Sequence, residues 1–246
     1  MLHIQIGAEK LFSIGSFAIT NTLLMTWIVA LFIIILSQVA VRRMQLVPLG
    51  VQNAVEWGVE SLLGFMEKIL HSRDKAIKYF PLIATIFTLI LFSNWFGILP
   101  GVGSIGLHQV HDGHEVFAPL LRSVASDLNF TLAIAIIAVV MTNVFGIIAL
   151  GFKSHASKFF NFSSPINFFV GILELIGEFA KLISYSFRLF GNIFAGEVLL
   201  IITGFLVPYF VPVPFLILEI FVGFVQALVF ATLTLVFISI AVEHHS

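Results

Sequence analysis

The sequence predicts an all-α integral membrane protein with about five membrane helices. Of its 246 residues, 59% are hydrophobic and only 10% are charged, whereas soluble domains carry about a quarter charged residues. Five segments are apolar over about 20 residues, the length that spans a hydrocarbon core of about 30 Å. Lipid offers no partner to free backbone groups, so each segment must be helical. The segments are 22–41, 80–100, 128–150, 165–207 and 213–242.

The composition also excludes several classes of partner. A net charge of -1 argues against a nucleic-acid partner, because phosphate binding depends on accumulated Lys and Arg. The chain has no cysteine, so it has neither disulfides nor a thiolate metal site. His108, His111 and His114 are three residues apart in a glycine-containing segment, which we interpret as a solvated loop; a metal site is the weaker alternative. We therefore expect no metal and no cofactor.

The positions of the basic residues predict the orientation of the chain. Segments 42–79 and 151–164 together hold eight Lys and Arg, whereas Lys10 and Arg122 are the only ones expected on the other side. Cytoplasmic loops carry the excess of basic residues. We therefore expect the N-terminus outside and the C-terminus in the cytoplasm, which agrees with five spans.

We interpret residues 1–246 as a single membrane domain with four parts. A segment at 49–71 alternates apolar residues with glutamates at helical spacing, which favours an amphipathic helix on the cytoplasmic membrane surface over a plain linker. The four parts are an outer N-terminus with the first span (1–41), a cytoplasmic interfacial segment (42–79), a two-span hairpin (80–150) and a long helical hairpin (165–242).

The last two helices are too long to stand upright in a bilayer. Segment 165–207 has no proline after its first residue, so we expect one unbroken helix. Such a helix would extend about 60 Å, twice the hydrocarbon thickness. Segment 213–242 would extend about 45 Å. A short proline-rich turn joins them, so we expect a strongly tilted hairpin.

Polar side chains interrupt both of these long apolar helices. A charge at the bilayer centre costs at least about 2.5–3.5 kcal/mol, so such residues usually face a partner or an aqueous path. The residues are Glu174, Glu178, Lys181, Arg188, Asn192, Glu197, Glu219 and Gln226.

Helical spacing places several of these residues on one stripe. Glu174, Lys181 and Arg188 are seven residues apart, which keeps them within about 20° of each other per step. Ser184 and Asn192 flank Arg188 at positions i-4 and i+4. The sequence therefore predicts a polar stripe that includes Arg188.

Glu197 is expected to face another direction. It lies nine residues after Arg188, about 180° around an ideal helix. Glu219 and Gln226, seven residues apart on the next helix, share one face. We expect Glu197 to turn toward both of them across the hairpin.

The predicted topology places Arg188 between two acidic groups. Glu174 and Glu178 follow the cytoplasmic loop, whereas Glu197 and Glu219 flank the outer turn. Arginine keeps its proton at physiological pH, so this arrangement describes two half-pathways that do not meet. The alternative is a structural cation, with Arg188 paired to Glu174 or Glu178.

Four motifs give the chain a resemblance to subunit a of the F-type ATP synthase. "RLFGNIFAGE" at 188–197 is the most specific, supported by "NWFGILPG" at 94–101, "SDLNFTLAIAI" at 126–136 and "FVQALVFATLTLVFISIA" at 224–241. The resemblance implies a stator subunit in a bacterial inner membrane that moves protons or sodium ions and has no catalytic site of its own. It implies as partners a ring of c subunits, the peripheral-stalk b subunits and the rest of the synthase.

The same resemblance implies roles for individual residues. Arg188 would face the ring and be essential for ion translocation. Asn192, Glu197, Glu219 and Gln226 would line ion access, and Glu174 and Ser184 would lie by the cytoplasmic exit. Some members of the family have a His where this chain has Glu219, so either acid could be the main relay.

Two other classes of function compete with this interpretation. A self-contained ion-coupled transporter would use Arg188 to bind an anionic substrate, and it predicts broken helices and paired halves. A structural membrane anchor is disfavoured by the eight polar residues in the last two helices. Copurification separates the three, since only a rotary motor requires a ring of small subunits.

Overall fold

The computed structural model confirms an all-α integral membrane protein. It describes residues 7–15, 17–41, 50–99, 101–103, 105–111, 114–159, 164–208 and 210–242. Five helices in these ranges are long and apolar enough to cross a membrane: α1 (Asn21–Val41), α3 (Arg73–Gly97), α4 (Leu128–Leu150), α6 (Pro165–Leu206) and α7 (Pro212–Val242). Two further helices are α2 (Val51–Leu70) and the short α5 (Phe152–Ser157).

The helix boundaries follow local capping signals. α4 coincides with the expected segment 128–150, and the side chain of its N-cap residue, Asp127, accepts a hydrogen bond from the backbone N–H of Asn129 at 2.9 Å. α3 begins seven residues before the expected start, because Ser72 caps it and the helix passes through Pro81. The polar turn before Phe80 is therefore part of α3, not of the interfacial segment.

Two short antiparallel hairpins were not expected. β1 (Lys10–Ile14) pairs with β2 (Phe17–Thr20), and β3 (Gly106–His111) pairs with β4 (His114–Pro119). The histidine-containing segment is thus a hairpin in which His111 and His114 are register partners. The interpretation as a solvated loop did not include these strands, because their pairing joins two segments and is not a pattern within one of them.

The core lies where four of the long helices meet. Its main cluster joins Ile90 of α3, Ala138 of α4, Leu189 of α6 and Phe230 of α7. A second cluster packs α2 against α3 and α7, and a third attaches α1 through Val29. Only one side of α6 enters the core, so its other side is exposed.

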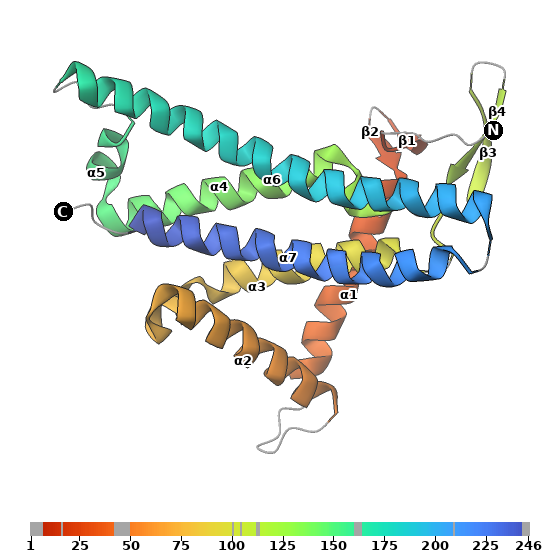
Figure 1. Ribbon diagram of the computed structural model, residues 1–246, viewed down its shortest axis with the longest axis horizontal. Coiled ribbons are helices and arrows are strands. Elements are labelled where there is room, and N and C mark those ends of the chain that lie inside the picture. Colours follow the sequence, from red (N-terminus) through yellow and green to blue (C-terminus); the bar gives the residue numbers. More distant parts are fainter. Residues whose placement is uncertain are drawn as a thin grey trace.

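α6 is one continuous helix of 42 residues, about 60 Å long. This confirms the expectation that the segment does not break. Figure 1 shows α6 and α7 side by side along the longest dimension, with α1 lying across their direction. A steep tilt of this hairpin in a bilayer stays a prediction. The orientation of the chain across the membrane also stays a prediction. Two of the basic residues that predict it, at 42–43, and the C-terminus lie outside the described residues.

Candidate functional site

Arg188 lies on the exposed side of α6. The adjacent Leu189 is fully buried in the core, so the helix turns Arg188 outward. Its Nη2 donates a hydrogen bond to Ser184 Oγ at 3.1 Å, one turn earlier. Within the described part of the chain, no carboxylate lies within 4.0 Å of the guanidinium. Arg188 is therefore available to a group outside this chain.

The alternative that Arg188 is a structural cation paired with Glu174 or Glu178 is wrong in this structure. Glu178 instead pairs with Lys181, whose Nζ lies 2.7 Å from Glu178 Oε1. These residues are three positions apart, so they meet on one face of α6. The ion-pair partner of Glu178 is therefore Lys181 and not Arg188.

One turn beyond Arg188, an amide pair joins the two long helices. Asn192 Nδ2 donates to Gln226 Oε1 at 2.7 Å, and Gln226 is buried. The expectation that Gln226 groups with Glu197 was therefore wrong. Glu219 and Gln226 are about 10 Å apart along α7, so in an antiparallel hairpin they meet different turns of α6.

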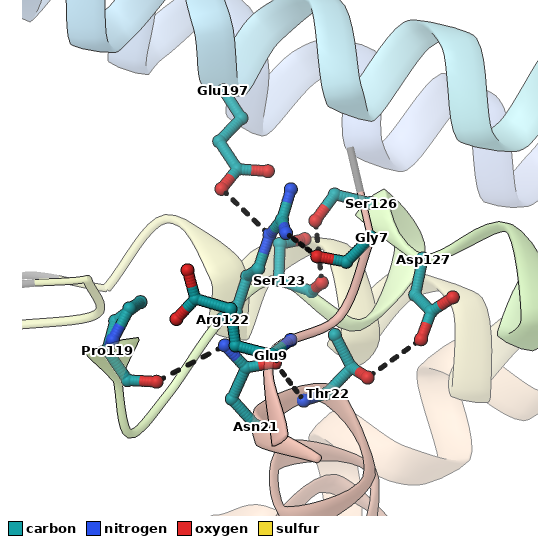
Figure 2. Close-up of polar contacts among 10 residues, drawn as sticks. All are labelled: Gly7, Glu9, Asn21, Thr22, Pro119, Arg122, Ser123, Ser126, Asp127 and Glu197. Carbon is teal, nitrogen blue, oxygen red and sulfur yellow. Dashed lines mark hydrogen bonds and ion pairs between the residues drawn. The ribbon is translucent and has the colours of Figure 1, made fainter. Parts of the chain in front are cut away.

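A cavity of about 590 Å³ lies at one end of the hairpin. Glu197 and Glu219 both line it, which agrees with the expectation that these two acids face each other across the hairpin. Arg122 Nε lies 3.3 Å from Glu197 Oε1 and forms an ion pair with it (Figure 2). Glu219 is only 8% exposed, and its Oε2 has no hydrogen-bond partner among the described residues. The two acids thus have different surroundings.

A second cavity, of about 300 Å³, lies between α4, α5, α6 and α7 near the start of α6. Glu174 and Glu178 line it. Asn143 Nδ2 donates to Glu178 Oε2 at 3.3 Å, and Asn143 Oδ1 lies 3.0 Å from His155 Nε2. A hydrogen-bonded chain therefore connects α5, α4 and α6 beside this cavity.

His155 is buried where the short helix α5 packs against α4. Burial lowers the pKa of His155, and Lys158 lowers it further, whereas Glu178 and Glu174 act in the opposite direction. The ring is consequently neutral at neutral pH, and one of its nitrogens can accept a hydrogen bond.

The two cavities lie toward opposite ends of α6. One is lined by residues between Val170 and Lys181, the other by residues between Ile193 and Ile201. Arg188 falls between them and lines neither of these two cavities. The arrangement places exchangeable acids on both sides of a cation that keeps its proton.

A model of the ATP synthase A chain family matches residues 23–239. The chain belongs to this family. Its relatives include ATP synthase subunit a of Gloeobacter violaceus, 35% identical over 98% of this chain and 92% of the relative. Subunit a of Syntrophobacter fumaroxidans is 34% identical over 99% of this chain and 92% of the relative. Subunit a of Moorella thermoacetica is 29% identical over the full length of both.

Membership of the ATP synthase A chain family confirms the resemblance that the motif at 188–197 indicated. The motif contributes three of the residues described above, namely Arg188, Asn192 and Glu197. In the structure they lie on successive turns of one helix. The family motif therefore runs from the exposed cation to the cavity of about 590 Å³.

Several residues of the two cavities were missed in the sequence. Arg122 was counted only as a basic residue outside the membrane, yet it is buried and paired with Glu197. A lone arginine in an otherwise apolar stretch was the signal that could have found it. His155 and Asn143 gave no such signal, because neither lies on a polar stripe that the sequence predicts.

Gly196 allows Glu219 to reach its position. A Cβ atom added at Gly196 would collide with Glu219 Oε1. We expect Gly196→Ala to displace this carboxyl group and to lower ion flux by about tenfold or more, since small displacements of reacting groups have large effects on rate. The measurement is ATP synthesis per assembled complex in vesicles with an imposed ion gradient.

Gly58→Ala is the matched control for this prediction. Gly58 is also helical, but a Cβ there meets nothing within 4 Å. This change should leave synthesis unaltered and stabilise α2 by up to about 1 kcal/mol. Equal rates in the two variants would show that the position of Glu219 does not matter.

Proposed function

We propose that this chain is the stator subunit of the membrane sector of a rotary F-type ATP synthase. It would lie in a bacterial inner membrane with its N-terminus outside and its C-terminus in the cytoplasm. Its partners would be the ring of c subunits and the peripheral-stalk b subunits. It would provide two offset half-channels through which protons or sodium ions reach and leave the ring.

The observation that carries this proposal is the placement of Arg188. Its guanidinium is exposed, it has no acidic partner among the described residues, and it lies between two separate acid-lined cavities. A cation without a partner in lipid is costly, so a carboxylate on another subunit is the natural partner. A rotor that carries one carboxylate per subunit supplies such a group in turn.

The proposed mechanism uses both cavities and Arg188. An ion enters the cavity lined by Glu197 and Glu219 and neutralises a ring carboxylate, which can then turn through lipid. After nearly a full turn, the carboxylate loses its ion into the cavity lined by Glu174 and ionises as it meets Arg188. The driving energy is about 2.3 kcal/mol per charge per 100 mV, together with the concentration term.

Arg188 also prevents a short circuit between the two cavities. Arginine cannot release its proton, so a proton cannot pass through it. Ser184 accepts a hydrogen bond from the guanidinium and holds its direction. The Asn192–Gln226 pair lies on α6 and α7 between Arg188 and Glu197, and its amides donate and accept hydrogen bonds but do not ionise.

Copurification tests the motor against a self-contained transporter. A transporter of the inverted-repeat class predicts helices that break near the bilayer midplane, whereas α6 and α7 are continuous over the described residues. Extraction of the tagged chain in mild detergent should recover a ring of small two-helix subunits in stoichiometric amount. A chain that purifies alone and transports a solute in vesicles would overturn the motor proposal.

A further inference from the structure

The segment before β1 is attached to the wall of the larger cavity. Arg122 Nη1 donates a hydrogen bond to the Gly7 carbonyl at 2.8 Å. The Glu9 N–H donates to Asn21 Oδ1 at 3.2 Å, and the Asn21 N–H donates to the Glu9 carbonyl at 3.1 Å. Asn21 is fully buried and also donates from Nδ2 to the Pro119 carbonyl. The backbone of Glu9 is thus fixed at both of its polar groups (Figure 2).

The side chain of Glu9 lines the same cavity as Glu197 and Glu219. Its Oε2 atom is buried and accepts no hydrogen bond from the described residues. Burial raises the pKa of Glu9, and the nearby Arg122 offsets this in part. The charged groups that share the cavity with Glu9 are Arg122, Glu197 and Glu219.

Attachment of the segment does not require the Glu9 carboxyl group. The hydrogen bonds to Arg122 and Asn21 use backbone atoms of Gly7 and Glu9. A glutamine at this position has nearly the same shape and leaves those bonds in place. The carboxyl group of Glu9 is therefore free to serve another purpose in the cavity.

We propose that Glu9 is a third ion-exchanging carboxylate of this cavity, which takes an ion from water and passes it toward Glu197 and Glu219. Glu9 precedes α1, so it lies before the first membrane span, whereas the other two acids belong to α6 and α7. Arg122 and Asn21 are positioning residues, since both hold the segment that carries Glu9. This inference rests on the proposed motor function.

Replacing Glu9 by glutamine tests the inference in the intact synthase. The complex is reconstituted in vesicles, and ATP synthesis per assembled complex is measured. The pH on the N-terminal side is varied from about 6 to about 8, which lies above the usual pKa of a carboxyl group. Glu9→Gln should lower the rate about threefold to tenfold at the high end, where protons are scarce. At the low end the rate should approach that of the unaltered protein, because bulk protons then suffice.

Two further variants separate the carboxylate from its surroundings. Glu9→Asp keeps an ionisable group and should recover most of the rate at high pH. Glu56→Gln removes an exposed acid of α2, whose carboxylate accepts from Gln52 Nε2, and should change nothing.

Two results would overturn the inference. One is an unaltered pH profile in Glu9→Gln. The other is a uniform loss at every pH that Glu9→Asp does not repair, because a purely structural role predicts it. Failure of the motor proposal itself would give a different result, namely normal synthesis in a variant that lacks Arg188.

Discussion

Arg188→Ala should abolish ion-driven ATP synthesis while the subunit continues to assemble. The side chain is exposed and donates one hydrogen bond, to Ser184, so its loss should change folding stability by only about 0.5 kcal/mol. Its proposed role cannot be replaced, because no other cation lies between the two cavities on the described part of α6. Synthesis and passive ion leak are measured in vesicles, and complex content is measured by immunoblot.

Arg188→Lys should fail as well, although it keeps a positive charge. An ammonium is a point charge that can lose its proton when it is desolvated, and it lacks the planar fork of the guanidinium. Lys68→Ala, which removes an exposed cation of α2, is the matched control and should retain synthesis. Normal synthesis in Arg188→Ala would contradict the proposed role of this residue.

Glu197→Gln and Glu219→Gln should each slow ion flux, and the double variant should be worse than either. The structure adds a difference between them. Glu197→Gln removes the ion pair with the buried Arg122, at a cost of about 1–3 kcal/mol because the pair is not fully buried. Glu219→Gln removes no ion pair in the described structure. The first variant should therefore lower both complex content and flux, and the second only flux.

A compensating change isolates these two contributions. Adding Arg122→Met to Glu197→Gln removes the buried guanidinium that has lost its ion pair with Glu197. Complex content should rise toward normal, whereas flux should stay low, because Arg122 also holds the segment that carries Glu9. Content and flux are measured on the same membranes. Unchanged flux in the Glu197→Gln, Glu219→Gln double variant would assign both acids to structure.

The helical architecture could be predicted because it depends on local composition. The apolar length of segment 128–150 fixed the bounds of α4, and the lack of proline in 166–206 was enough to predict one unbroken helix. Helical spacing predicted the polar stripe that includes Arg188 and Ser184, which are hydrogen-bonded in the structure. Predicting these features requires no information on contacts between residues that are distant in the sequence.

The details of the cavities could not be predicted, because they depend on contacts between distant residues. Arg122 and Glu197 are 75 positions apart, and Arg122 meets Gly7 across 115 positions. Periodicity within one helix carries no information on such pairs. The grouping of Gln226 with Glu197 failed for the same reason, since the register of α6 against α7 decides which turns meet.

A high-resolution map of the intact membrane sector tests the central claim most directly. We expect α6 to be tilted by about 60° from the membrane normal, since about 60 Å of helix must fit a core of about 30 Å. We expect the Arg188 guanidinium to face a carboxylate of the ring, with the two cavities open to opposite sides of the membrane. A map in which α6 stands within about 20° of the normal, or in which Arg188 faces away from the ring, would contradict the account.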